Sequence, residues 1–131
     1  MTRINDDNAK AQMRKGILEY CILAILSRED SYAPKIIACL KRADLIVVEG
    51  TLYPLLTRMK NAGYLAYRWE ESPQGPPRKV YTLTDAGREY LEFLDEAWDE
   101  LVAQIRLVRR GGDEQWQEIA AAGNDDANKE C

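Results

Sequence analysis

The sequence contains no histidine, and its three cysteines form no paired motif. Histidine is the commonest general base and metal ligand in proteins. Cys21 and Cys39 lie in apolar helical patterns, where a free thiol behaves as a small hydrophobe, and Cys131 ends the chain. We therefore expect a reducing compartment and no enzyme activity, metal site or cofactor.

Long apolar segments are also absent. The chain has no run of about eighteen apolar residues, which a membrane-spanning helix requires. Residues 1–7 lack the apolar core of a signal peptide. We expect a cytoplasmic protein without membrane contact. With 131 residues, 46% of them hydrophobic, the chain is long enough for one domain with its own core.

Charge is distributed unevenly around a net value of −4. Residues 31–80 carry eight basic and four acidic side chains, a balance of +4, whereas residues 84–131 carry five basic and thirteen acidic ones, a balance of −8. A phosphate-contacting surface requires such a local positive excess, even in an acidic protein.

The stretch 49–59 predicts an amphipathic helix. Leu52, Leu55, Leu56 and Met59 recur at i, i+3, i+4 and i+7, and the opposite face is small and polar. Pro54 lies about one turn in, so the helix either starts late or bends there. The small polar face suits close approach to a polyanion, as in a recognition helix. The alternative is an ordinary half-buried helix with a solvated face.

Two helices are predicted before this stretch. The first covers 8–27, with a possible break at Gly16, and is apolar all round from 17 to 26. Such a helix is buried on every side, either by its own domain and a second copy or as the central core helix of a monomer. The second covers 32–43, with Ser31 as its N-cap. Its apolar residues Ala33, Ile36, Ile37 and Leu40 recur at i, i+3, i+4 and i+7. A brief extended connection or short strand at 44–48 follows, and Gly63 suits the left-handed position after the helix of 49–59.

A hairpin is predicted after it. Leu65, Tyr67 and Trp69 alternate with polar or small residues in the strand 64–71, which predicts one buried side. Residues 79–83 form a second strand, and the proline-rich connection 72–78 cannot be a strand. Three helices and a hairpin predict a winged helix-turn-helix, with 72–78 as the tip of the wing. A plain surface hairpin is the alternative.

Thr84 is expected to cap a final helix over 85–110, whose apolar residues follow a heptad spacing typical of a dimerisation helix. Packing only within its own chain is the alternative. The predicted architecture is mainly α with a small β-hairpin. It consists of a winged helix-turn-helix at 1–83, a dimerisation helix at 84–112 and an acidic, disordered tail at 113–131.

Three segments resemble the signatures of the PadR family of bacterial transcriptional regulators. They are Glu49-Gly50-Thr51-Leu52-Tyr53-Pro54-Leu55-Leu56, Gly75-Pro76-Pro77-Arg78-Lys79 and Tyr81-Thr82-Leu83-Thr84-Asp85-Ala86-Gly87. The single C-terminal helix resembles the short subfamily. Val48 departs from the family pattern, which usually has serine or proline there, and Ala33-Pro34 and Val80 depart as well.

The resemblance implies a homodimeric repressor that binds double-stranded DNA with its third helix in the major groove and its wing at phosphates or the minor groove. Such regulators act on a nearby transporter or stress gene and on their own promoter. In some short members, planar aromatic or cationic drugs stack between two tryptophans of the last helix. Trp98 falls at the matching place, although a heptad-seam tryptophan is also explained as core.

The expected contacts fall into two groups. Thr51, Tyr53 and Thr57 are expected at base edges or phosphates, and the basic residues at phosphates. The full DNA-contacting set is Gly50, Thr51, Tyr53, Thr57, Arg58, Lys60, Pro77, Arg78 and Lys79. The expected dimer contacts are Leu18, Ile22, Leu91, Leu94, Trp98, Leu101, Ile105 and Val108. Two rival hypotheses are a winged-helix module that binds only proteins, and a thiol redox sensor that uses Cys39 or Cys131.

Overall fold

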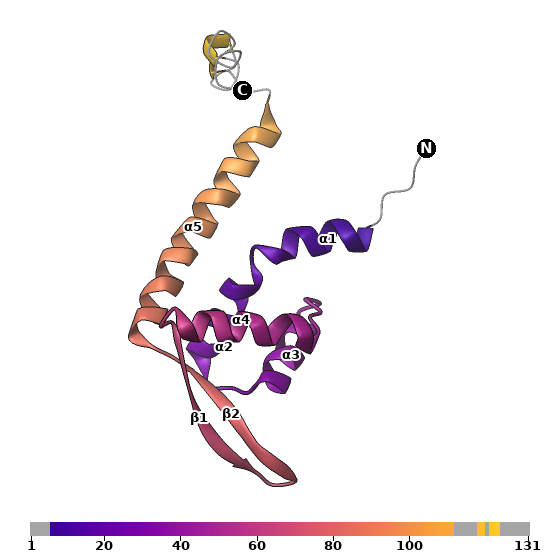
Figure 1. Cartoon of the computed structure of the whole chain (residues 1–131). Helices are drawn as coiled ribbons and strands as arrows, with labels where there is room; N and C mark the ends of the chain where they lie inside the picture. The colour runs from indigo at the N-terminus through magenta and orange to yellow at the C-terminus, as the bar shows by residue number, and fades with distance from the viewer. Residues whose placement is uncertain (1–5, 112–117, 120, 124–131) are drawn as a thin grey trace. The chain divides into compact units, whose positions relative to one another are not determined.

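The computed structural model describes residues 6–111, 118–119 and 121–123 (Figure 1). Its main elements follow the order α1 (Asp6–Lys15), α2 (Leu18–Arg28), α3 (Ala33–Arg42), α4 (Glu49–Asn61), β1 (Leu65–Ser72), β2 (Gly75–Leu83) and α5 (Asp85–Arg110). The two strands form an antiparallel sheet. The chain divides into two compact units, residues 1–93 and 94–131. The predicted mainly helical fold with one hairpin is confirmed.

Helix boundaries agree closely with the sequence pattern. The expected break at Gly16 separates α1 from α2, and α5 has the expected bounds. The predicted tail, 113–131, lies largely outside the described residues, and its described residues 118–119 and 121–123 are helical. The connection 45–48 is irregular rather than a strand.

The core lies where α2, α3 and α4 meet the base of the hairpin (Figure 1). Helices α3 and α4 each bury one stripe, so their predicted apolar faces are confirmed. The most deeply buried side chains are Ile22, Leu23, Leu26, Ile36, Leu40, Leu52, Leu56 and Met59.

The chain covers Leu18 and Ile22 by itself. Leu18 is 8% exposed and Ile22 has no exposed surface. The prediction that Ile22 contacts a second copy is therefore wrong, because a side chain already removed from water gains nothing further from a partner. Leu18, which is also buried, would gain little from contact with a partner. The all-round apolar pattern of α2 is that of a core helix.

Ser31 pairs with the hairpin instead of capping α3. Its amide donates to the carbonyl of Tyr81 (3.1 Å) and its carbonyl accepts from the Tyr81 amide (2.7 Å). Tyr32 occupies the N-cap position without a side-chain cap bond, so the predicted cap is wrong. Its backbone pairing makes Ser31 almost fully buried, at 1% exposed. The pairing attaches the base of β2 to the start of α3.

The hairpin is longer than predicted. Strand β2 begins at Gly75, so the predicted connection 72–78 narrows to a turn at Pro73 and Gln74. Glu70 pairs with Arg78 and Ser72 with Gly75, which leaves two β2 residues, the prolines 76 and 77, opposite one β1 residue. This is a β-bulge, a position that tolerates proline because the ladder already lacks hydrogen bonds there.

An ion pair joins the hairpin to the end of α2. Arg68 of β1 donates to the Asp30 carboxylate at 2.8 Å. This hydrogen bond, with a weaker one from Thr82, holds the pKa of Asp30 below its ordinary value. This ion pair on β1 supplements the backbone pairing of Ser31 with Tyr81 on β2.

The predicted buried side of β1 extends over one residue only. Leu65 is buried, whereas Tyr67 is 37% and Trp69 62% exposed. Alternation correctly places these side chains on one face of the strand. The prediction of burial is wrong for Trp69, because the hairpin extends beyond the helical core that covers Leu65 (Figure 1).

Thr84 joins α4 to α5. Its hydroxyl donates to the Gly63 carbonyl (2.7 Å) and accepts from the Gly87 amide (3.0 Å), while its own amide donates to the Tyr64 carbonyl (3.1 Å). The predicted cap is confirmed, and so is the left-handed Gly63 (φ 89°) after α4. The Tyr64 and Tyr90 rings stack at 4.3 Å between centroids. We call this cluster of Gly63, Tyr64, Thr84, Gly87 and Tyr90 the α4–α5 joint.

The joint requires a glycine at 87. A Cβ there would overlap the Tyr64 carbonyl oxygen and lie 2.7 Å from Leu83 Cδ1. We expect Gly87→Ala to lower the free energy of unfolding by about 1–3 kcal/mol. The matched control is Gly50→Ala, because a Cβ at that helical position meets nothing within 4 Å. It should raise stability by about 0.5–1 kcal/mol. Urea unfolding followed by circular dichroism measures both, and equal effects would contradict the assignment.

Candidate nucleic-acid interface

Helix α4 presents one polar face to solvent. Thr51, Tyr53 and Thr57 are exposed, while Leu52 and Leu56 are buried beneath them. The helix begins at Glu49, before Pro54, so it does not start late. It also begins without a side-chain cap, because Val48 precedes it.

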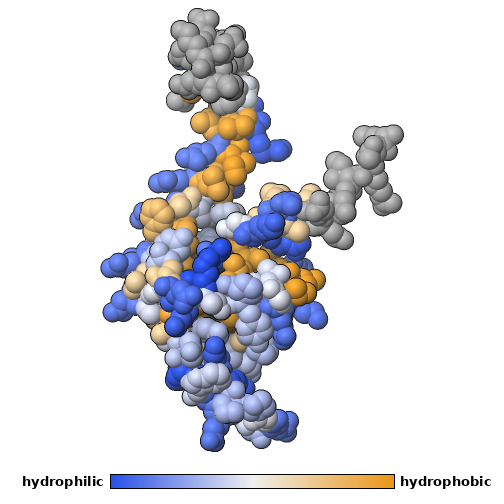
Figure 2. Space-filling model, viewed as in Figure 1, coloured by the Kyte–Doolittle hydropathy of each residue, from blue (hydrophilic) through white to orange (hydrophobic). Residues whose placement is uncertain are grey.

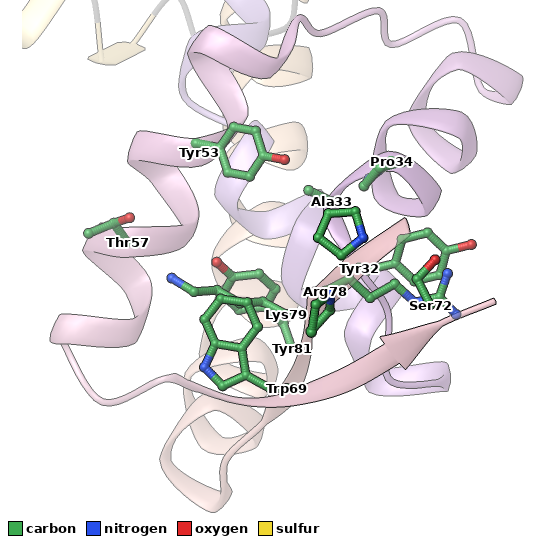
Figure 3. A pocket seen from close by; sticks show the side chains of 12 residues that line it. Tyr32, Ala33, Pro34, Tyr53, Thr57, Trp69, Ser72, Arg78, Lys79 and Tyr81 are labelled. Atoms are coloured by element: carbon green, nitrogen blue, oxygen red, sulfur yellow. The ribbon is translucent and has the colours of Figure 1, made fainter. Parts of the chain in front are cut away.

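A cleft of about 510 Å³ separates this face from the hairpin (Figure 3). Tyr53 and Thr57 border it from α4, and the hairpin contributes Trp69, Arg78 and Lys79. The start of α3 closes one end with Tyr32. The complete lining is Tyr32, Ala33, Pro34, Tyr53, Thr57, Trp69, Ser72, Pro76, Pro77, Arg78, Lys79 and Tyr81.

Two lysines lie beside aromatic rings at this cleft. Lys79 Nζ is 4.5 Å from the Tyr67 ring centroid and 5.5 Å from that of Trp69. Lys60 Nζ, from α4, is 5.7 Å from the same Tyr67 ring. Lys60 and Lys79 also line a smaller adjoining hollow with Thr57 and Tyr81. The ammonium groups thus come from both the helix and the hairpin and converge on one place.

Arg78 forms part of the cleft wall. Its guanidinium lies 3.9 Å from the centroid of the Tyr32 ring, and Glu70 is a weaker partner at 3.8 Å. Its Nε is buried and has no hydrogen-bond partner among the described residues. Stacking of this kind fixes a guanidinium plane. Arg78 is therefore held in place by Tyr32, and its side chain is one-third exposed.

Arg58 points away from the cleft. Its guanidinium forms an ion pair with Glu19 of α2, and it does not line the cleft. The Glu19 carboxylate offsets part of the charge of Arg58, while 68% of the arginine side chain stays exposed. Gly50 and Thr51 are exposed on the first turn of α4, also outside the lining. Of the predicted set, the structure thus brings Tyr53, Thr57, Pro77, Arg78 and Lys79 together at the cleft, and Lys60 joins Thr57 and Lys79 in the adjoining hollow.

Several cleft residues were not among the predicted contacts, chiefly Tyr32, Trp69 and Tyr81. Burial raises the pKa of the Tyr81 hydroxyl, with smaller contributions from Tyr53 and Tyr67. The surplus of tyrosine and tryptophan near the basic residues was the available signal. The strand alternation, however, had assigned Trp69 to the core.

Helix α5 carries an exposed apolar row. Leu91 and Leu94 are half-buried, and the more C-terminal members of the predicted heptad are open to solvent. Their exposed fractions are 41% for Trp98, 49% for Leu101, 50% for Ile105 and 61% for Val108. Hydrophobic surface is visible along α5 in Figure 2.

Metal and membrane sites find no support in the part of the chain that the structure describes. No cluster of three or more possible metal-ligating side chains occurs among those residues. None of the described helices combines the length and hydrophobicity that membrane crossing needs.

Known proteins resemble this chain in fold and in sequence. Residues 22–93 match the model of the transcriptional regulator PadR-like family. A PadR-like transcription factor from Bacteroides fragilis is 56% identical (TM-score 0.67), over 77% of this chain and 98% of that one. A PadR-like regulator from Bacillus cereus is 37% identical (TM-score 0.66), over 76% and 98%. An uncharacterized protein from Lysinibacillus sphaericus is 26% identical over 105 residues, 78% of this chain and 96% of the relative. The family match and the B. fragilis relative show that this chain belongs to the PadR-like family of DNA-binding transcriptional regulators.

Proposed function

We propose that this regulator is a repressor that binds a pseudo-palindromic operator as a homodimer, near its own gene or a transporter or stress gene. The observation that carries the proposal is the cleft between α4 and the hairpin, with Lys79 in its wall and Lys60 beside it in the adjoining hollow. Such a regulator works in the cytoplasm, where the DNA is.

The polar face of α4 suits the major groove. Thr51, Tyr53 and Thr57 are exposed hydrogen-bonding side chains that reach base edges or phosphates, and Gly50 permits close approach of the backbone. Lys60 and Lys79 neutralise phosphates. Pro77 and Arg78 shape the hairpin side of the cleft, with Arg78 acting mainly through its stack on Tyr32. Arg58, whose side chain is 68% exposed beside Glu19, contributes a further phosphate contact.

The exposed apolar row of α5 suits a second copy. Side chains such as Leu101 and Ile105 are about half exposed in the single chain. Packing against the same row of a partner would remove this apolar surface from water and so stabilise the dimer. Two recognition helices, one from each subunit, would then read half-sites about one helical turn, roughly 34 Å, apart. Repression follows from occupancy of promoter DNA.

Ligand response is the finer part of the proposal. A planar aromatic or cationic molecule between Trp98 and its symmetry mate would shift the two α5 helices. The α4–α5 joint links the first turn of α5 to Gly63, two residues after the C-terminus of α4, so it would transmit that shift to the recognition helix. Ligand and DNA binding would then oppose each other by linkage.

The rival thiol sensor has less support. Burial raises the pKa of the Cys21 thiol, which lowers its thiolate fraction. Cys39 is half-buried and unbridged, and Cys131 lies outside the described residues. A module that binds only proteins would not need two lysines of one cleft to converge.

The proposed phosphate contact at Lys79 predicts a change in salt dependence. Lys79→Ala should weaken binding to any duplex and make the slope of log K against log salt shallower by about one unit. Lys41→Ala is the control, because Lys41 is an exposed lysine on α3 that does not line the cleft. Fluorescence anisotropy over a salt series measures both. Equal slopes for the two variants would remove Lys79 from the phosphate contacts.

The proposed dimer predicts that Ile105→Glu is monomeric, because a carboxylate pair in an apolar seam is costly to desolvate. Ala103→Glu adds the same charge nearly opposite on the helix, where Ala103 is also exposed, and should leave the dimer intact. Sedimentation velocity should give 15.0 kDa for the first variant and twice that for the second. A wild-type protein of 15.0 kDa would overturn the homodimer.

The ligand proposal predicts that planar aromatic cations quench tryptophan fluorescence and release DNA. Trp98→Phe should lose most of the quenching and the release together, since the indole is the stronger cation–π platform. Titration of a dye panel against both proteins, with and without duplex, tests this. Quenching that persists unchanged in the variant would assign the effect to another tryptophan.

A further inference from the structure

Trp69 is an exposed indole on the surface that faces α4. It lines the cleft from the hairpin side, opposite Tyr53 and Thr57, and 62% of its surface is open to solvent (Figure 3). A tryptophan left this exposed inside a concave surface lined with cations marks a contact that the free protein does not complete.

The indole is held in a defined position. Its ring meets the Tyr67 ring edge to face, with centroids 6.1 Å apart and planes at 88°. Lys79, its register partner across the hairpin, places Nζ 5.5 Å from its ring centroid. A side chain already oriented by two neighbours loses little rotational freedom when it binds.

The position of the cleft determines what enters it. In a duplex, one sugar–phosphate strand separates the major groove from the adjacent minor groove. If α4 lies in the major groove and the hairpin lies at the adjacent backbone or minor groove, that strand must pass between them. The cleft between α4 and the hairpin is the space left for it. This step rests on the proposed DNA-binding mode.

A sugar–phosphate strand has charged phosphates and apolar deoxyribose surfaces, and the cleft offers groups that suit each. Lys60 and Lys79 suit its phosphates. The indole and the adjoining Pro76 and Pro77 offer apolar surface to the deoxyribose. The carboxylate of Glu70 on the same hairpin lies 3.6 Å from Arg68 and 3.8 Å from Arg78, so its charge is compensated.

We propose that Trp69 is a DNA contact that packs against the deoxyribose of the strand lying in this cleft, beside the phosphate held by Lys79. The contact is apolar and independent of base sequence. It therefore adds affinity without releasing counterions, unlike the lysine next to it. The tryptophan and the lysine of one hairpin rung thus contribute separable parts of the binding free energy.

The test uses the full chain and a fluorescein-labelled duplex of mixed sequence, about three helical turns long. Trp69→Ala should weaken binding roughly tenfold at every salt concentration and leave the slope of log K against log salt unchanged. Trp69→Phe should restore most of the affinity. Lys79→Ala, measured beside them, should change the slope. A second readout is acrylamide quenching, since the duplex should protect wild-type fluorescence more than that of Trp69→Phe.

Three other outcomes would contradict the proposed contact or the binding mode on which it rests. Unchanged affinity in Trp69→Ala overturns the contact. A slope that becomes shallower by about one unit in that variant shows that Trp69 only positions Lys79, which also overturns it. If the wild-type protein shows no salt-dependent binding, the proposed DNA-binding mode itself fails. Thermal unfolding of each variant tests whether its fold is intact.

Discussion

The hydrogen bonds of Thr84 are the constraint on which the rest of the arrangement depends. One hydroxyl both caps α5 and donates to the carbonyl of Gly63, two residues after α4 ends, so two helices with different tasks share a single anchoring point. The close approach at Gly87 is possible only without a Cβ, and it lets the first turn of α5 lie against the Tyr64 backbone. The signature residues Thr84 and Gly87 are thus explained by geometry at the joint rather than by contact with DNA.

The fold was largely predictable because its signals are local. Apolar spacing defined α3, α4 and α5, and Gly16, Gly63 and Thr84 marked helix ends correctly. The failures involve partners distant in sequence. Ser31 has the residue type of an N-cap, but its backbone pairs with Tyr81 fifty residues later in the chain. Ile22 belongs to a pattern that a second copy or the chain itself can cover, and the pattern does not distinguish the two.

The candidate site was predictable as a region but not as a set of contacts. The basic middle third does contain the residues that converge at the cleft, and the net charge of −4 conceals them because the acidic residues are concentrated after residue 84. Residue type alone made Arg58 and Arg78 equivalent to Lys60 and Lys79. The structure distinguishes them. Arg58 pairs with Glu19, and Arg78 stacks on Tyr32 in the cleft wall, whereas Lys60 and Lys79 meet in the hollow that adjoins the cleft.

The paired prolines of β2 oppose β-pairing between the hairpins of two molecules. In a two-stranded sheet both strands are edges, and an edge with free amide and carbonyl groups invites pairing with another chain. Pro76 and Pro77 have no amide hydrogen, and the bulge they occupy bends the strand where the hairpin lies farthest from the core. A stiff, exposed hairpin is thereby protected from intermolecular β-pairing and from the aggregation that follows it.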